Sequence, residues 1–167
     1  PTFLSKAVSV MECSAHVHIV HTGHQTFGQE TRIFCPVDFN VFKLVNANQI
    51  SYCSLYRREV FEAVGGYNPN MVWGYEDWDF WIRAIEAGVE FHHINKGLFY
   101  YRDLPNSMIK NAKPKMDILM KYMIEKHSTL YARYVLEIGR ELSYARRKPF
   151  RHFVRRLFSG KIKLCFR

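Results

Sequence analysis

One segment near the middle of the chain, residues 73–88, combines clustered acids with large aromatic side chains and constrains the fold most. Over residues 76–87 the apolar positions recur at helical spacing, which predicts an amphipathic helix. Gly88 follows where a helix-capping glycine is typical. The segment therefore predicts a packed helix with an acidic start, whose inward side chains are Phe80, Trp81, Ala84 and Ile85.

Three carboxylates, Glu76, Asp77 and Asp79, lie in the first turn of this helix. Backbone N–H groups and the helix dipole favour negative charge there, so the acids could serve as caps alone. However, adjacent helical residues point about a hundred degrees apart, so Glu76 and Asp77 can address two groups of one ligand. The tryptophans around them favour this second interpretation, a ligand site.

Charge is distributed unevenly along the chain. The net charge is +9, and nine of the 24 basic residues follow position 145 with no acid among them. The other 15 basic residues balance the 15 acidic ones, so the body of the chain is neutral. A nucleic-acid-binding domain usually spreads its basic footprint over a folded face, so we expect no nucleic-acid partner.

The basic tail, residues 146–167, also carries an apolar stripe at helical spacing. A basic amphipathic helix of this kind is typical of binding to an anionic membrane surface. Packing of the same helix on its own domain or on a partner is the alternative. The stripe consists of Phe150, Phe153, Val154, Leu157 and Phe158.

The four cysteines form no C-x-x-C pair and no dense framework, which favours a reducing compartment. No apolar run approaches the roughly 20 residues of a membrane span, and the first residues do not resemble a signal peptide. We therefore expect a cytoplasmic protein, peripheral at the inner face of the cell membrane if the tail binds lipid.

Periodicity and turn residues predict the remaining elements. Residues 1–11 predict a helix with Phe3, Leu4, Ala7, Val8 and Met11 on one side. Next we expect a strand at 15–21, a hairpin or loop at 22–36, a short helix capped by Asp38 and a strand at 51–55. A helix at 58–64, ended by Gly65 and Gly66, is followed by a loop at 67–75. After the acidic helix come strands at 89–94 and 97–101, separated by a turn at 95–97, and then helices over 115–147 with a break near His127.

Several short motifs in a fixed order resemble a known family. They are Gly65-Gly66-Tyr67-Asn68, Glu76-Asp77-Trp78-Asp79-Phe80, Tyr100-Tyr101-Arg102 and Asn106-Ser107-Met108, preceded by similar stretches at 48–51 and 55–61. Together they resemble the acceptor-binding, C-terminal half of a family 2 glycosyltransferase with the GT-A fold. The resemblance covers roughly residues 3–108.

The resemblance implies an α/β fold: a partial GT-A mixed sheet with flanking helices, followed by a helical C-terminal extension. Its implied boundaries are 1–108 for the acceptor-binding half, 109–145 for the helical extension and 146–167 for the basic amphipathic tail. It also implies polysaccharide biosynthesis, with a nucleotide-sugar donor and a glycan or lipid-linked acceptor.

By resemblance, Asp77 is the general base of an inverting sugar transfer, and Glu76 hydrogen-bonds a neighbouring acceptor hydroxyl. The helix N-terminus is expected to keep Asp77 ionised near neutral pH. Aromatic side chains can stack on the apolar face of a sugar ring. The implied substrate-binding residues are Trp73, Gly74, Tyr75, Trp78, Gly66 and Arg102.

Two departures from the family affect the expected cofactor. No D-x-D motif precedes Glu76, so the nucleotide-binding half is missing. Leu104 stands where the family often has a metal-binding histidine, and Asp103 is only a weak substitute. Mg²⁺ or Mn²⁺ is therefore expected to be held mostly by residues outside this chain, and the fragment alone is expected to be inactive.

Two alternatives to a transferase remain. One is a non-catalytic sugar-binding or scaffolding domain tethered to a membrane surface. The other is a metal site built on the clustered histidines, because His16 and His18 would share a strand face; ordinary satisfied or solvent-facing histidines are favoured over it. The cluster is His16, His18, His21 and His24.

Overall fold

The computed structural model describes residues 2–35, 39–105 and 107–148. The chain divides into two compact units, residues 1–127 and 128–167. The described part of the second unit is helix α7 (Ser128–Arg147), which is amphipathic and ends with Arg146 and Arg147. Most of the basic tail lies outside the described residues, so its predicted helix is not described. None of the helices in the described segments is long and apolar enough to cross a membrane.

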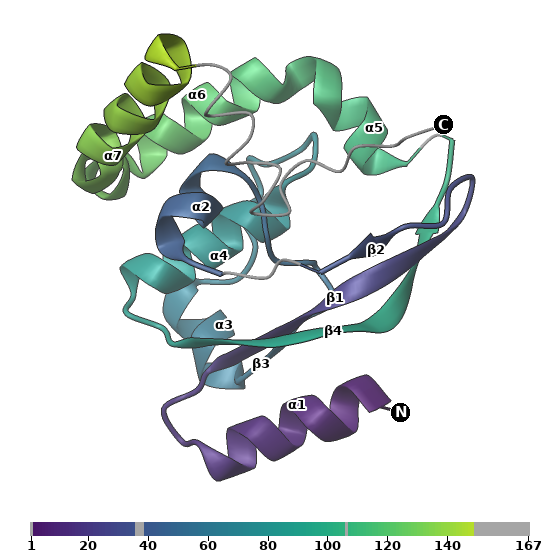
Figure 1. The fold of residues 1–167 in the computed structure, drawn as a ribbon. Coiled ribbons are helices and arrows are strands. Elements are labelled where there is room, and N and C mark those ends of the chain that lie inside the picture. Colours follow the sequence, from purple (N-terminus) through teal and green to yellow (C-terminus); the bar gives the residue numbers. More distant parts are fainter. Residues whose placement is uncertain (1, 36–38, 106, 149–167) are drawn as a thin grey trace. The chain divides into compact units, whose positions relative to one another are not determined.

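A mixed sheet built around strand β1 (Ile19–Gly28) organises the first unit. Strand β4 (Phe91–Asp103) runs parallel to β1 along its whole length. On the other edge, β3 (Leu55–Tyr56) and β2 (Ile33–Phe34) pair antiparallel with the beginning and the later part of β1, respectively. Figure 1 shows β1 and β4 side by side. The predicted α/β class with a mixed sheet is confirmed.

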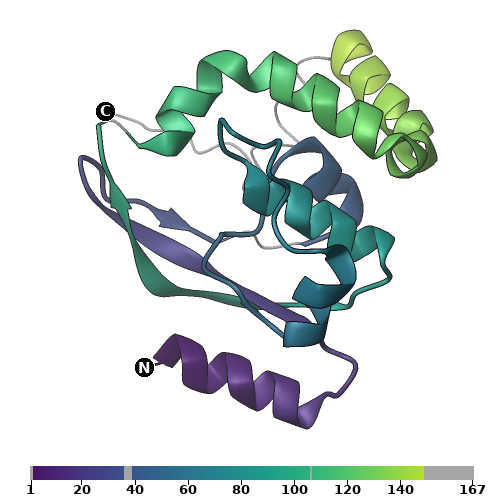
Figure 2. The same ribbon diagram turned by 180° about the vertical axis from the view of Figure 1, so that it is seen from behind.

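Helix α1 (Thr2–Cys13) covers one face of this sheet, and the other helices of the unit lie on the opposite face (Figures 1 and 2). Ala7 and Met11 pack with Val17 and Val20 in a buried cluster. The predicted helix is confirmed, but the set of side chains predicted to face the core is wrong in part. Leu4 and Val8 are exposed, while Phe3 and Val10 pack against the cluster. The turn of the helix places positions 3, 7, 10 and 11 on one side.

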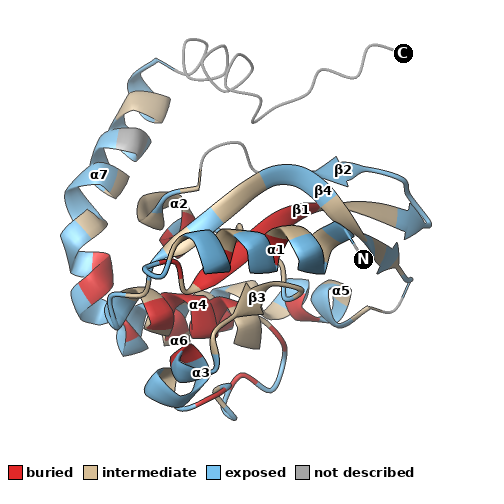
Figure 3. Ribbon diagram, turned by 90° about the horizontal axis from the view of Figure 1, so that it is seen from below, coloured by how far each residue is buried: buried red, intermediate tan, exposed pale blue. Residues whose placement is uncertain are grey.

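Helix α4 (Glu76–Glu86) is the most continuously buried helix of the first unit (Figure 3). Phe80, Trp81 and Ala84 are fully buried as predicted, whereas Ile85 is only half-buried. The helix ends as the glycine predicts. Gly88 has φ +75°, its N–H bonds to the carbonyl of Ile85, and the next N–H bonds to the carbonyl of Ala84. These two bonds form a Schellman cap.

Helices α2 (Val41–Asn46) and α3 (Arg58–Val64) pack beside α4. The helix α3 has the predicted bounds and ends at Gly65, whose φ is +74°. The short helix α2 was also predicted, but its described cap is Asn40, whose side chain accepts a hydrogen bond from Lys43 N. The position predicted as the cap, Asp38, lies outside the described residues.

The strand predictions were less accurate. The single strand β4 replaces two predicted strands, because residues 95–97 form a bulge rather than a turn: Thr22 pairs with Ile94 and the next residue, Gly23, pairs with Gly97. Extra residues in one strand bend it locally but do not reverse the chain as a turn does. Likewise β1 begins only at Ile19 and continues through the predicted loop to Gly28, and β3 is only two residues long.

After the sheet the chain becomes helical. Helix α5 (Met108–Ala112), a 3₁₀ turn η1 (Lys113–Lys115) and helix α6 (Met116–Lys126) follow one another. The predicted helix break near His127 is confirmed, and the boundary between the two compact units falls there. The predicted boundaries at 108 and 145 concern family domains rather than compactness, so they stay predictions.

Candidate functional site

The loop before α4 has an unusual backbone that shapes the start of the helix. Gly74 has φ +109°, a conformation that side chains rarely adopt, and Tyr75 has φ +62°. Among the described residues, Tyr75 is the one non-glycine residue with positive φ. Its carbonyl accepts the first helical hydrogen bond, from Asp79 N at 3.1 Å. Such conformations cost about 1–3 kcal/mol and are concentrated at functional sites.

Asp77 is held by neighbouring donors at the N-terminus of α4. The side-chain amide of Asn48 donates to Asp77 Oδ2 at 3.1 Å, and Trp78 N donates to Asp77 Oδ1 at 2.8 Å. Burial of the carboxyl nevertheless raises its pKa to about 6, with a smaller contribution from the charge of Glu76. Burial thus outweighs the hydrogen-bond donors at the helix N-terminus, so the pKa is raised rather than lowered. Asp77 remains mostly ionised at pH 7.

A cavity of about 810 Å³ opens beside the start of α4. Both Glu76 and Asp77 line it, and so do Asn48 and Asp103. Cavities of this size are typical of small-molecule sites. Its lining comes from the sheet, the segment after α2, the start of α4 and the α5–α6 region: His24, Thr26, Phe34, Asn46, Ala47, Gln49, Ile50, Ser51, Tyr52, Gly74, Tyr75, Trp78, Tyr101, Met108, Ile109, Met116 and Met120.

Aromatic side chains form much of the wall nearest the carboxylates. The rings of Tyr52 and Tyr101 lie 5.9 Å apart, and those of Tyr75 and Trp78 lie 5.7 Å apart. Trp78 is only 3% exposed, and its indole N–H donates to the carbonyl of Leu44 at 2.7 Å. The tyrosines therefore present more accessible ring surface to a ligand than Trp78 does.

The cavity includes most but not all of the predicted site residues. Glu76, Asp77, Gly74, Tyr75 and Trp78 line it. The other three predicted substrate-binding residues are not among the lining residues: Trp73, Gly66 and Arg102.

Each of those three residues has a different environment. Trp73 is 40% exposed, with Lys115 Nζ 4.3 Å from its ring centroid. Gly66 is buried against Phe61, where an added Cβ would lie 2.9 Å from the ring. The exposed Arg102 lies over the ring of Phe27, with its Cζ atom 5.5 Å from the ring centroid. A substrate role for these residues stays a prediction.

The third carboxylate of the segment, Asp79, is not among the residues that line the cavity and is fully buried. It accepts hydrogen bonds from Arg83 Nε at 2.7 Å, Lys126 Nζ at 2.8 Å and Asn68 Nδ2 at 3.3 Å. His127 Nε2 lies 3.1 Å from Asp79 Oδ1, and its other ring nitrogen lies 2.8 Å from Glu86 Oε2. Asp79 thereby joins α4 to the end of α6 and to the loop before α4.

The bonds to Asp79 determine its ionisation. Burial by itself would raise the pKa of the carboxyl, but the hydrogen bonds from His127, Lys126 and Arg83 outweigh burial and hold that pKa well below its usual range. A buried carboxylate with several charged donors is a structural ion pair network rather than a proton acceptor. Asp77 and Asp79, two residues apart, therefore have pKa values shifted in opposite directions.

The acids and histidines of the described residues do not make a metal site. No group of three or more histidine, cysteine, aspartate or glutamate side chains that could hold a metal ion occurs among them. The weak metal candidate, Asp103, is instead paired with Lys110 Nζ at 2.8 Å. The described residues therefore offer no preformed cage of protein ligands, whereas Mg²⁺ is usually held by one or two carboxylates together with waters and substrate phosphates.

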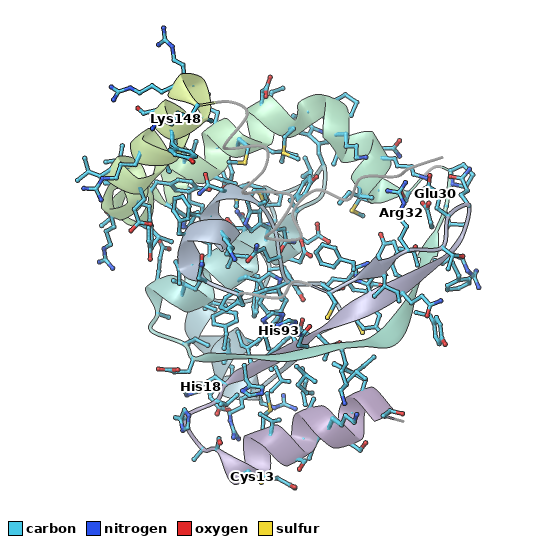
Figure 4. The ribbon with its side chains drawn as sticks, in the orientation of Figure 1. Cys13, His18, Glu30, Arg32, His93 and Lys148 are labelled. Atoms are coloured by element: carbon cyan, nitrogen blue, oxygen red, sulfur yellow. The ribbon has the colours of Figure 1, made fainter. Side chains whose placement is uncertain are left out.

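The histidine cluster is divided by the start of β1. His16 and His18 precede the strand, and His16 is exposed, so the shared strand face expected of them is wrong. His21 is fully buried and stacks on His93, with ring centroids 4.6 Å apart. Burial lowers the pKa of His21 to about 3, with help from His93 and His92. Figure 4 labels His93 on β4.

The histidines of the cluster were expected to be either hydrogen-bonded or solvent-facing, and among the described residues His21 is neither. Neither ring nitrogen of His21 has a hydrogen-bond partner within the described segments. A neutral imidazole that packs between aromatic rings explains its placement: the ring of Phe39 lies 5.0 Å from it.

Sequence reasoning missed several lining residues. Asn48 and Tyr101 lie in stretches that carry the family resemblance, so the signal was present but no role was assigned to them. The cavity-lining methionines of α5 and α6 gave a different signal. In sequence they resemble ordinary core positions of a helix, and their placement at a cavity depends on tertiary structure.

Residues 31–107 match the family model described as the N-terminal domain of galactosyltransferase. The match covers less than half of the chain, yet it spans β2 through β4 and includes Asn48, Glu76 and Asp77. No curated protein gives a significant match to the chain. The family match supports a glycosyltransferase domain in this chain, with a nucleotide-sugar donor and an acceptor as its substrates.

Proposed function

We propose that the chain forms the acceptor-binding part of an inverting glycosyltransferase of the family 2 type, with Asp77 as its general base. The observation that carries the proposal is the placement of Asp77 and Glu76 together in one cavity with aromatic walls. The match of residues 31–107 to a galactosyltransferase family model supports the same class of reaction.

In the proposed reaction, Asp77 accepts the proton of an acceptor hydroxyl. The hydroxyl oxygen attacks the anomeric carbon of a nucleotide-sugar, and the bond from that carbon to the diphosphate breaks as the nucleoside diphosphate leaves. A pKa of about 6 suits this role, because the carboxylate is ionised at pH 7 and still basic enough to take a proton. The carboxylate of Glu76 accepts a hydrogen bond from a neighbouring hydroxyl, and Tyr52 or Tyr101 stacks on the ring.

The described residues of this chain supply acceptor binding and proton removal in this proposal. Because no preformed group of three or more metal ligands occurs among the described residues, we propose that any Mg²⁺ or Mn²⁺ would be held mostly by a nucleotide-binding part outside this chain. We accordingly propose that the 167-residue chain alone does not transfer sugar. Delivery of acceptors at the inner face of a cell membrane, through the tail at 146–167, belongs to the same proposal.

The test compares Asp77→Asn with wild type in a protein that includes the nucleotide-binding part. Transfer from a panel of nucleotide-sugars with Mn²⁺ should fall by roughly 10² or more, because a positioned base contributes about that factor. Donor binding should remain. The matched control is Asp117→Asn, at an exposed position of α6 outside the cavity, which should transfer at the wild-type rate.

Two results would contradict the proposal. Equal turnover by wild type and Asp77→Asn would reduce the acidic start of α4 to a structural role. Absence of turnover in both proteins, with saccharide still bound, would favour the non-catalytic sugar-binding domain instead.

A further inference from the structure

The lining of the cavity has a polar part and an apolar part. Carboxylates and the amide of Asn48 lie at the start of α4, whereas the lining contributed by the segment from position 103 onward is apolar except for Asp103. That segment places three methionines and one isoleucine on the cavity, and we call this set the methionine wall: Met108, Ile109, Met116 and Met120. The charge of Asp103 is engaged by Lys110.

The methionine wall is adjacent to the polar part of the lining. A Cβ added at Gly74 would lie 3.4 Å from Met108 Cγ, so Met108 abuts the loop that leads directly into Glu76 and Asp77. Figures 1 and 2 show α5 and the start of α6 passing on the same side of the sheet as α4. A ligand whose hydroxyl meets Asp77 therefore has the methionine wall beside it.

The apolar surface also continues outward from the cavity. Met108 is 63% exposed, Ile109 is 43% exposed, and nearby Leu104 is 49% exposed. A second sugar ring would require hydrogen-bonding side chains along this path. Thioether side chains are flexible and polarisable, which suits contact with a flexible hydrocarbon better than with a hydroxylated ring.

We infer that the acceptor is an amphipathic glycoside, with its sugar at Asp77 and Glu76 and an alkyl-chain aglycone along the methionine wall. The inference rests on the proposed function and specifies its acceptor class. The volume of about 810 Å³ exceeds what one sugar ring fills, and the polar and apolar parts of one cavity require a ligand with both characters.

Binding of alkyl glycosides to the 167-residue chain tests the inference. The probes are methyl, butyl and octyl β-glycosides of glucose, galactose and N-acetylglucosamine, titrated by calorimetry below their micelle-forming concentrations. Each fully buried methylene tightens binding about three- to fourfold, so at least one butyl glycoside should bind about tenfold or more tightly than its methyl counterpart.

Variants locate the effect on the wall. Met116→Gln combined with Met120→Gln keeps side-chain length and helix propensity, and should remove most of the dependence on chain length. Ile118→Gln, on the same helix but 58% exposed and outside the cavity, should keep it. Circular dichroism checks that each variant is folded.

Three results would overturn the inference: equal binding of methyl and octyl glycosides, a chain-length dependence that survives in the double variant, or no binding of any probe. These results concern binding alone. Failure of the proposed function would appear instead as transfer that is insensitive to Asp77→Asn, so the two failures are distinguishable.

Discussion

Asn48 Nδ2 lies 3.1 Å from Asp77 Oδ2, which joins the segment after α2 to the first turn of α4. The oxygen of the same amide accepts a hydrogen bond from Ile50 N at 3.1 Å, so the orientation of the Asn48 side chain is fixed by the backbone two residues later. Asn48 thereby donates to one oxygen of Asp77 while Trp78 N donates to the other. The carboxylate is held in one orientation toward the cavity.

The contact from Asn48 should control the pH dependence of transfer. Hydrogen bonds favour the charged form of Asp77, and one to a charged group contributes about 1.5–3 kcal/mol, which corresponds to about one pKa unit or more. Asn48→Ala should therefore raise the pKa of Asp77 above its value of about 6 and move the acidic limb of the rate profile to higher pH. Asn48→Asp should move it further, because the new carboxylate repels the old one. The measurement is kcat/KM against pH; an unmoved limb in both variants would exclude this role.

Asp77 should also reduce the stability of the fold at neutral pH. Its pKa is about 6 in the folded state and 3.8 as an isolated group. Since the folded state holds the proton more tightly, stability decreases as pH rises from about 4 to about 6 and stays lower above that. At pH 7 the ionised carboxylate then lowers the free energy of unfolding by about 1–3 kcal/mol.

Asp77→Asn should consequently raise the free energy of unfolding at pH 7 by that amount, while chemical denaturation at pH 4 and below should show little gain. A variant that is less stable than wild type at pH 7 would indicate that the donors, not burial, dominate at this carboxyl. Gain of stability with loss of activity is the pattern expected of a functional carboxylate.

Replacement of Asp79 should lower the stability of the fold, in contrast to replacement of Asp77. Asp79→Asn removes the charge that Arg83, Lys126 and His127 share, and loss of one partner from a buried ion pair typically costs about 3–5 kcal/mol. Asp117→Asn, at an exposed position, should change stability by about 0.5 kcal/mol or less.

The sign of the pH effect distinguishes Asp79 from its neighbour. Because the pKa of Asp79 is depressed in the folded state, its contribution is fully present above about pH 4 and is lost as pH falls toward the folded pKa. The difference between wild type and Asp79→Asn in urea denaturation should therefore shrink on acidification. A difference that stays constant from pH 7 to pH 3 would contradict the assignment.

Local signals explain which elements could be predicted from the sequence. The helices α3 and α4 were predictable because apolar spacing and a terminal glycine, Gly65 or Gly88, both lie within the segment itself. The bulge in β4 was not, because the residues that form it resemble a turn until β1 is known to run alongside.

The site was predictable to the same limited extent. Glu76 and Asp77 are recognisable from local sequence, but the raised pKa of Asp77 depends on burial that only the tertiary structure determines. Asp77 lines the cavity whereas Asp79 is held in a buried ion-pair network. This difference depends on Lys126 and His127, which lie almost fifty residues away in the chain. The methionine wall likewise requires α5 and α6 to be placed against the loop at Gly74.

The loop at Gly74 provides the last prediction. Gly74→Ala places a side chain at φ +109° and 3.4 Å from Met108, so it should destabilise the fold by about 1–3 kcal/mol or displace Met108 from the cavity. Gly139→Ala is the control, since Gly139 lies within α7 with nothing within 4 Å of the added Cβ, and alanine is the better helix former by about 1 kcal/mol. Thermal denaturation should therefore show a lower Tm for Gly74→Ala and an equal or higher Tm for Gly139→Ala. An unchanged Tm together with unchanged alkyl glycoside binding in Gly74→Ala would mean that the close approach of α5 to this loop does not constrain the site.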